Sequence, residues 1–396
     1  HDVLEYGARG DAQTNDAPAI QRAIDACHSA GGGIVLVPAG RTYLSGSLAL
    51  KANVELQIER GAILRASVER ADYGGYTFGS SPVFISGVEA HNAAITGAGT
   101  IDGQGRRFMT SELPHMYKST LDWRPHLICV LKCRGFTVRE VTLRDSANWA
   151  LHLTGCVDVL VHGIRILNDL KVPNCDGIDP DHCRNVRISD CHIEAGDDCI
   201  VIKNRAEYPD LGPSENITIT NCTLISTSCA VKIGTESIDD FRAIVVSNCV
   251  IRGSHRGLGI QLRDQGNVED VLFANCVVET RHFHEDWWGG AEPIHISAFP
   301  RRAGAPLGTI RRVRFRDIHC HGESGAVIAS HEPGHIDDIV FDGVRIAVDC
   351  WTRHPGDMLD RRPCGMTGVV RRTVSGVHAV HVKDLVLREV DVRWGA

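Results

Sequence analysis

A short unit recurs along the middle of the chain: a small polar residue, then Cys, then apolar residues at every second position. Cys133 and Cys156 open two such units 23 residues apart, and Cys222, Cys249 and Cys276 open three more at intervals of 27 residues. Alternation with a period of two is the pattern of β-strands, because successive side chains point to opposite faces. The repeat therefore predicts a solenoid of short strands, in which each turn buries its apolar residues against the next.

We therefore expect an all-β chain, a right-handed parallel β-helix formed by residues 1–396 as a single domain. Helical periodicity is confined to a segment that opens with Asp16 as the expected N-cap, and this short helix would cover the open end of the solenoid as a cap of about residues 1–33. Segments 281–308 and 352–378 leave the period and are expected as loop insertions. By length the chain would also accommodate two or three domains. A β-propeller, which needs repeats of about 40 residues, is the alternative fold.

Composition narrows the classes of partner. The formal net charge is -7, and the Arg-rich stretch 311–316 alternates with apolar residues as a half-exposed strand would, so nucleic acid is not expected as a partner. No apolar run approaches the roughly 20 residues that cross a bilayer, so no membrane partner is expected either. The fifteen cysteines are odd in number and mostly lie in strand-like runs, which favours buried thiols. Cys350 and Cys364 are the best candidates for one disulfide.

Three acidic residues carry the first functional signal. Asp176 precedes the pair Asp197 and Asp198 by about one solenoid turn. Acids at equivalent positions of neighbouring turns repel one another, and this repulsion raises the pKa of at least one of them. Hydrolysis of a bond between sugars needs one protonated carboxyl and one carboxylate that activates water, so the pattern indicates a glycosidase. A single corner Asp can instead satisfy backbone N–H groups, and Asp179 and Asp181 are expected to be structural.

The chain resembles glycoside hydrolase family 28, the polygalacturonases and their relatives. The resemblance runs from YGARGDAQTNDAPAIQRAIDAC through GAGTIDGQG to about Thr280, and its specific part is NCDG, which starts at Asn174, with GDD, which ends at Asp198. It implies that Asp197 is the general acid and that Asp176 and Asp198 hold and deprotonate the attacking water, with inversion. It also implies no cofactor, no metal, a polysaccharide or oligosaccharide substrate, and a secreted or periplasmic location. A chain that opens at His1 fits processing during export, and β-helices of this size are expected to act as monomers.

Two family motifs are altered. Where the family usually has Gly-His-Gly, residues 228–230 read Ser-Cys-Ala, and where it has Arg-Ile-Lys, residues 261–263 read Gln-Leu-Arg. A neutral thiol and an amide cannot pair ionically with a carboxylate, so the contacts to an anionic sugar are expected to be weaker. Solvated charge at the edge of the coil is the alternative role for the cations. The expected substrate-binding positions are Asn174, Cys229, Gln261, Lys203, Lys232 and Arg263, the last three if they point outwards.

Aromatic and imidazole side chains add further candidates. Trp149, Trp287 and Trp288 are expected to form a stacking platform for sugar rings, and the alternative is that the last two plug a loop onto the coil. The histidines and neighbouring acidic residues form two further groups of candidates. A metal site at His282, His284, Glu285 and Asp286 is less favoured than a surface cluster, and His152, His182 and His295 are candidates for a cleft.

The leading hypothesis is a hydrolase of pectic or related polysaccharides that contain uronic acid or rhamnose. We favour exo action slightly, because the two long insertions could close one end of a cleft. A polysaccharide lyase that uses Asp-bound Ca²⁺ and a Lys or Arg base is the second hypothesis. A carbohydrate-binding β-helix without turnover is the third, although a binder has little reason to crowd three acids.

Overall fold

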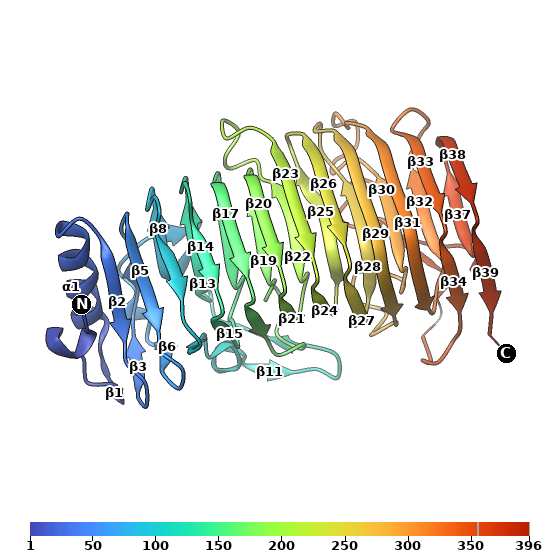
Figure 1. Cartoon of the computed structure of the whole chain (residues 1–396). Coiled ribbons are helices and arrows are strands. Elements are labelled where there is room, and N and C mark those ends of the chain that lie inside the picture. The colour runs from blue at the N-terminus through green and yellow to red at the C-terminus, as the bar shows by residue number, and fades with distance from the viewer. Residues whose placement is uncertain (355, 396) are drawn as a thin grey trace. The chain divides into compact units, whose positions relative to one another are not determined.

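The computed structural model describes residues 1–354 and 356–395, which form two compact units, residues 1–196 and residues 197–395. Each unit consists of short parallel strands stacked turn upon turn (Figure 1). The prediction of a right-handed parallel β-helix is confirmed. None of the helices in the described residues is both long and apolar enough to span a bilayer.

The first unit begins with the expected cap. After the short helix η1 (Val3–Tyr6), α1 (Ala17–Ser29) lies at the end of the strand stack (Figure 1), with its buried residues on one face, as predicted. Asp16 stands at the N-cap position, but the predicted cap bond is absent. Its carboxylate accepts hydrogen bonds from the N–H groups of Arg9 and Gly10 at 2.7 and 2.9 Å, and Asn15 Oδ1 accepts the N–H of Ala17 instead. The preceding loop, whose amides point at Asp16, outcompetes the helix for this carboxylate.

Three parallel ladders run through the first unit. The first contains β2 (Gly33–Val37), β5 (Val54–Ile58), β9 (Ala94–Thr96), β14 (Thr137–Arg139), β17 (Val157–His162) and β20 (Arg184–Ser189). The second contains β1 (Asp11–Asn15), β3 (Thr42–Ser45), β6 (Ile63–Ala66), β10 (Thr100–Asp102), β15 (Thr142–Arg144), β18 (Arg165–Leu167) and β21 (His192–Ala195). The third contains β4 (Leu48–Ala49), β8 (Ser81–Val88), β13 (His126–Leu131), β16 (Leu151–Thr154) and β19 (Ile178–Asp181).

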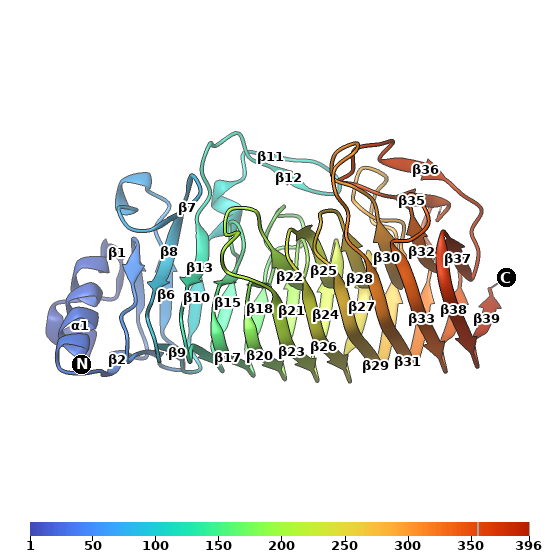
Figure 2. The same ribbon diagram turned by 90° about the horizontal axis from the view of Figure 1, so that it is seen from above.

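Short elements decorate this unit. β7 (Thr77–Phe78) pairs antiparallel with β8, and β11 (Ser111–Glu112) pairs antiparallel with β12 (Tyr117–Lys118). The helical turns η2 (Arg70–Asp72) and η3 (Gly105–Phe108) lie in the connections between strands. Figure 2 shows β11 and β12 on a long loop that stands away from the strands of its own unit.

The second unit repeats this plan. One ladder contains β23 (Ser214–Thr220), β26 (Phe241–Ser247), β29 (Val268–Thr280), β31 (Ile310–Gly322), β33 (Ile336–Asp342) and β38 (Val382–Arg388). A second contains β24 (Thr223–Ser226), β27 (Val250–Ser254), the ends of β29 and β31, β34 (Arg345–Val348) and β39 (Asp391–Trp394). The third contains β22 (Ile200–Asn204), β25 (Cys229–Ser237), β28 (Arg256–Leu262), β30 (Ile294–Ala298), β32 (Ala326–Ser330) and β37 (Val377–Val380).

The two segments predicted as loop insertions contain strands of their own. β30 lies within 281–308, where Ile294, Ile296 and Ala298 alternate towards the core. β35 (Met358–Asp360) and β36 (Val369–Arg371) form an antiparallel hairpin within 352–378 (Figure 2). The prediction missed these strands because neither segment follows the Cys-led repeat on which it was based.

A ladder of three phenylalanines lies in the core of the second unit. Phe315 stacks on Phe273 with ring centroids 4.8 Å apart, and Phe341 meets its other side at 4.9 Å. The prediction of buried thiols is confirmed, since thirteen of the fifteen cysteines are buried. Cys350 and Cys364 are also thiols, so the disulfide predicted between them is absent from the described residues.

Candidate active site

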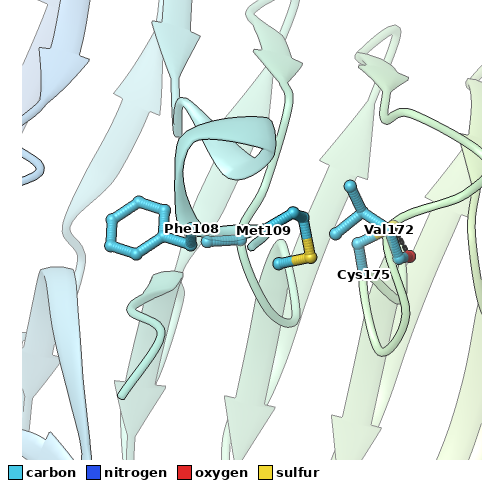
Figure 3. Close-up of a cluster of buried hydrophobic side chains, with 5 residues drawn as sticks. Phe108, Met109, Val172 and Cys175 are labelled. Atoms are coloured by element: carbon cyan, nitrogen blue, oxygen red, sulfur yellow. Dashed lines mark hydrogen bonds between the residues drawn. The ribbon is translucent and has the colours of Figure 1, made fainter. Parts of the chain in front are cut away.

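Asp176 lies in the first unit on the short connection that leads into β19. Its side chain is buried, and its carbonyl oxygen accepts the N–H of Ala150 at 2.9 Å. A small apolar cluster holds this connection, and Figure 3 shows four of its members, Phe108, Met109, Val172 and Cys175. The position of Asp176 is therefore determined by packing on both sides of the loop.

Asn174 is exposed two residues before Asp176. Its Oδ1 accepts a hydrogen bond from Arg124 Nη2 at 2.9 Å, while Arg124 Nη1 donates to the carbonyls of Pro173 and Ala147 at 2.7 and 3.1 Å. Asn174 itself has φ = 57°, a left-handed conformation that Asn tolerates better than most residues. Arg124, which sequence reasoning missed, thus fixes the shape of this motif.

The predicted structural acids and cleft imidazoles form a buried network. His152 Nε2 lies 3.1 Å from Asp181 Oδ2, and His182 Nε2 lies 3.8 Å from Asp181 Oδ1. The half-buried ring of Trp149 packs edge-on against His152, with centroids 4.9 Å apart. Asp179 is buried as well, in register with His152. His152 and His182 are therefore interior residues of this unit.

The pair Asp197 and Asp198 opens the second unit, just before β22. Asp197 is half-buried, and its Oδ1 accepts the N–H of Asp198 at 3.0 Å. Asp198 is only 1% exposed; its Oδ1 accepts bonds from Ser228 Oγ at 2.8 Å and from the N–H of Cys229 at 3.0 Å, and its Oδ2 contacts Lys232 Nζ. Two neighbouring acids thus have different surroundings.

Lys232 is a buried cation rather than an exposed one. Burial would lower the pKa of its ammonium, but the charges of Asp198 and Asp197 prevail and raise it, so Lys232 stays protonated. Lys232 is buried and forms a direct ion pair with Asp198, so it does not meet the condition of pointing outwards under which it was predicted to bind a substrate. Asp198 precedes β22 and lies outside the register of β22 with β25, so the sequence repeat did not reveal this contact.

Cys229 contributes its backbone, not its thiol. The thiol donates to the carbonyls of Val231 and Gly257 at 3.2 and 3.6 Å, and burial together with the charge of Asp198 raises its pKa to about 12. A Cβ at Gly259 would lie 2.8 Å from Cys229 Sγ, so the thiol needs glycine at that position of the next strand. The Cys229 side chain is therefore a neutral packing group.

A pocket of about 350 Å³ lies in the second unit. Glu236, one of its lining residues, lies 3.8 Å from Lys203 Nζ. Burial would raise the pKa of Glu236, but Lys203, Lys232 and Arg301 lower it to about 2. The other lining residues come from the loops beside β22, β25, β28 and β30, and they are Arg205, Ala206, Glu207, Ile238, Asp264, Arg301, Arg302 and Ala305.

The arginines of the pocket differ in their partners. Arg301 is held by Asp264 through two hydrogen bonds of 2.8 Å, and it also donates to the carbonyl of Thr235 at 2.5 Å. Arg205 pairs with Glu207. Arg302 is exposed and forms no ion pair with the described residues, so its guanidinium is available to a ligand.

Gln261 and Arg263, the altered motif, both lie in the interior. Gln261 is in register with Gly234 and Ser297 and is 3% exposed. Arg263 is fully buried and donates to the carbonyls of Leu262 and Ser297 at 2.9 and 3.3 Å, and burial lowers its pKa to about 9. Arg263 does not point outwards, so it does not meet the condition under which it was predicted to bind a substrate. The alternation of side chains along the strand, counted from Gln261, does not determine the direction in which the long side chain of Arg263 folds.

A second buried ion pair went unnoticed in the sequence. Arg256 donates to Glu292 through Nε at 3.0 Å and Nη2 at 3.4 Å, and Nη2 also donates to the carbonyl of Asp360 at 3.0 Å. Burial would raise the pKa of Glu292, but Arg256 holds it well below the usual value. His295, whose Nδ1 lies 3.3 Å from Glu292, is buried, and burial lowers its pKa to about 4. These contacts join three segments that are distant in sequence.

Trp287 and Trp288 sit where the two inserted segments meet. Arg362 Nη2 donates to the carbonyl of Trp287 at 3.0 Å, and its guanidinium lies 5.7 Å from the Trp288 ring. Trp288 is 47% exposed, whereas Trp287 is half-buried. The four residues of the less favoured metal site also differ in exposure: His282 is buried, His284 is half-buried, and Glu285 and Asp286 are exposed.

Comparison with known proteins places this chain among carbohydrate-active enzymes. Residues 27–282 match the family model described as "Glycosyl hydrolases family 28". A "Probable polygalacturonase" of Vitis vinifera is 30% identical over 342 residues, which cover 80% of this chain and 67% of that protein. An "Endo-polygalacturonase" of Pectobacterium parmentieri is 26% identical over 355 residues, covering 83% and 84%. The structure of an exopolygalacturonase from Thermotoga maritima superposes with a TM-score of 0.80 at 23% identity, covering 99% and 91%, which is a likeness of fold.

Proposed function

This chain belongs to family 28 of the glycosyl hydrolases, and on that basis we propose that Asp197 is the general acid and that Asp176 and Asp198 bind and deprotonate the attacking water. The protein is a glycoside hydrolase that acts on pectic polysaccharides. The three acids match the family's motifs in order and spacing. One carboxyl that is protonated and another that is ionised are what an inverting hydrolysis requires.

The contact between Lys232 and Asp198 carries this assignment of roles. An ammonium against a buried carboxylate favours charge on both groups, which suits a residue that must accept a proton. Asp197 is half-buried and has the greater access to a sugar. In the proposed step, the Asp197 carboxyl gives its proton to the glycosidic oxygen as that bond breaks. A water attacks the anomeric carbon from the opposite face, and its proton passes to the ionised acid.

The pocket lined by Arg301 and Arg302 supports a uronic acid as one of the bound sugars. Arg302 is exposed, and a guanidinium binds a carboxylate through two parallel hydrogen bonds. This cation would take over the task of the altered motif, whose Gln261 is neutral and whose Arg263 is buried. We propose a galacturonate-containing oligosaccharide as the substrate, with rhamnose as a neighbouring sugar.

The two inserted segments support exo action. The N–H of Gly289 donates to Asp360 Oδ2 at 2.8 Å, and Arg362 joins the same segments through Trp287. Segments tied together in this way can close one end of a cleft, so the enzyme would release sugars from chain ends. The exposed ring of Trp288 would stack on a sugar there. We further propose a single-domain monomer that is secreted or periplasmic, where polymeric substrate is met.

The test is product analysis by mass spectrometry in water enriched in oxygen-18, with polygalacturonan and rhamnogalacturonan oligosaccharides. Wild-type protein should release monosaccharide or disaccharide that carries one heavy oxygen, and proton NMR should show the inverted anomer first. Asp197→Asn should lose turnover and keep substrate binding. Asp158→Asn, which changes an exposed acid paired with Arg134, is the matched control and should retain full activity. A product lighter by one water would establish a lyase, and binding without any product would refute hydrolysis.

A further inference from the structure

The turn between β32 and β33 brings together two imidazoles and a carboxylate. Its sequence is His331-Glu332-Pro-Gly-His335. His331 Nε2 lies 3.2 Å from Glu332 Oε1, and His335 Nε2 lies 3.4 Å from the same oxygen. The three atoms lie within 4.8 Å of one another. The cluster is remote in sequence from the acids proposed for catalysis, and the hydrolase reaction makes no use of it.

The hydrogen bond on the far side of His335 determines what its Nε2 can do. Nδ1 lies 2.8 Å from the carbonyl oxygen of Gly308, which can only accept, so the proton resides on Nδ1. In the neutral ring Nε2 is then a bare lone pair, and it faces a carboxylate oxygen. Two acceptors at 3.4 Å repel each other unless a proton on Nε2 or a metal ion lies between them. A carbonyl that binds the second ring nitrogen is the usual support of a metal-bound histidine.

The spacing suits a small transition-metal ion. With bonds of about 2.0 to 2.1 Å and tetrahedral angles, the ligand atoms around Zn²⁺ lie about 3.3 Å apart. The measured separations of 3.2 and 3.4 Å bracket this value. Two imidazoles and one carboxylate are ligands that Zn²⁺, Cu²⁺ and Ni²⁺ accept, whereas Ca²⁺ and Mg²⁺ prefer oxygen alone.

The two imidazoles are held in place before any ion binds. Their side chains are 19% and 17% exposed, and the rings lie 5.1 Å apart at 31° to each other. The N–H of His331 donates to the carbonyl of Ala298 at 3.1 Å, so the turn is attached at Ala298 and, through His335, at Gly308. These two points bound the connection from β30 to β31, which carries Arg301 and Arg302 of the pocket.

We propose that His331, Glu332 and His335 form a binding site for one Zn²⁺-like divalent transition-metal ion, with water as the fourth ligand. The ion braces the turn after β32 and, through Ala298 and Gly308, the connection that carries the pocket arginines. It takes no part in hydrolysis.

The experiment uses tag-free full-length protein that has been dialysed against a chelator. Zn²⁺ is added in a calorimetric titration, and Co²⁺ is added in parallel as a probe whose visible absorption reports its ligands. We expect one Zn²⁺ per chain and a higher thermal unfolding midpoint. The affinity for Zn²⁺ should fall at least about tenfold in His335→Gln and in Glu332→Gln. Tenfold is the smallest loss expected when a residue that supports a metal ligand is removed.

A surface imidazole with a single carboxylate provides the matched control. His321 Nε2 lies 2.8 Å from Asp349 Oδ2 with no second histidine in the pair, so His321→Gln should bind Zn²⁺ like the wild type. Glu332 is 61% exposed, so Glu332→Gln is expected to fold even if a histidine variant does not. Equal affinity in wild type and Glu332→Gln would overturn the proposal. A Co²⁺–thiolate absorption band that disappears in Cys350→Ser would overturn it as well, because the exposed thiol would then be the ligand.

Discussion

Replacing Lys232 by Met tests whether the ion pair with Asp198 holds the proposed catalytic carboxylate. The substitution keeps the length of the side chain and removes its charge. Asp198 would keep only two of the contacts described above, those from Ser228 and Cys229, at a position that is 1% exposed. A buried charge that loses its partner costs about 3 to 5 kcal/mol. With a slope of about 3 kcal/mol per molar urea, the unfolding midpoint should fall by about 1 to 1.7 M.

A double-mutant cycle separates this pairing from loss of packing. Lys232→Met leaves the buried Asp198 carboxylate without its cation, and Asp198→Asn removes that negative charge. The loss of stability in the double variant should therefore be smaller than the sum of the two single losses by at least about 1 kcal/mol. Urea unfolding followed by circular dichroism measures all four proteins. Lys383→Met, which removes a 72% exposed ammonium beside Asp337, should stay within about 0.5 kcal/mol of wild type. A coupling below about 0.5 kcal/mol would refute the reasoning.

Three further predictions follow from the second unit. The pKa values of His255 and His295 are lowered to about 3 and 4 in the folded protein, chiefly by burial. The unfolded chain therefore binds protons that the folded chain does not. Stability should decline as the pH falls from about 6.5 towards 4, by about 1.4 kcal/mol per pH unit for each histidine. Urea unfolding should show a shallower decline in His255→Gln, and an unchanged slope in this variant would contradict the prediction. Phe315→Ala, at the centre of the Phe stack, should lower the free energy of unfolding by about 3 to 5 kcal/mol, whereas an effect below 1 kcal/mol would show that the stack is not packed as described. Arg302→Ala should raise KM for uronate-containing oligosaccharides about 10- to 150-fold, which corresponds to the loss of one charged hydrogen bond, with little change in kcat. An equal rise in KM for a neutral glycan would exclude carboxylate recognition.

The solenoid could be predicted because its signal is local and repeated. Each turn carries the same alternation, and the Cys that opens it marks the start of an inward-facing strand, as at Cys222 and Cys249. The helix α1 was predictable for the same reason, from five apolar residues on one face. Asp16 holds the predicted N-cap position, but its carboxylate does not bind the helix, because the loop that precedes the helix supplies better-placed donors.

The partners of buried charges were not predictable from the repeat. Arg256 meets Glu292 and the carbonyl of Asp360, which are 36 and 104 residues away, across segments that carry no period. The same limit explains Arg263, whose flexible side chain binds an acceptor in the interior at Ser297, so the condition of pointing outwards for binding a substrate is not met. Motif matching identified the acids, whereas the contact between Lys232 and Asp198 required the folded structure, because Asp198 lies before β22 and outside its register with β25.

The thirteen buried thiols bear on how this protein is inactivated. While the coils are stacked, oxidants cannot reach sulfur atoms such as that of Cys249, whose pKa is raised to about 12 by its contact with Cys222 and by burial. A chain that opens, even briefly, exposes many thiols at once, and these can cross-link in arrangements that block refolding. Operational lifetime in an oxidising medium would then be governed by the rate of unfolding rather than by the equilibrium free energy. A reductant should lengthen the half-life at elevated temperature without changing the initial rate of catalysis.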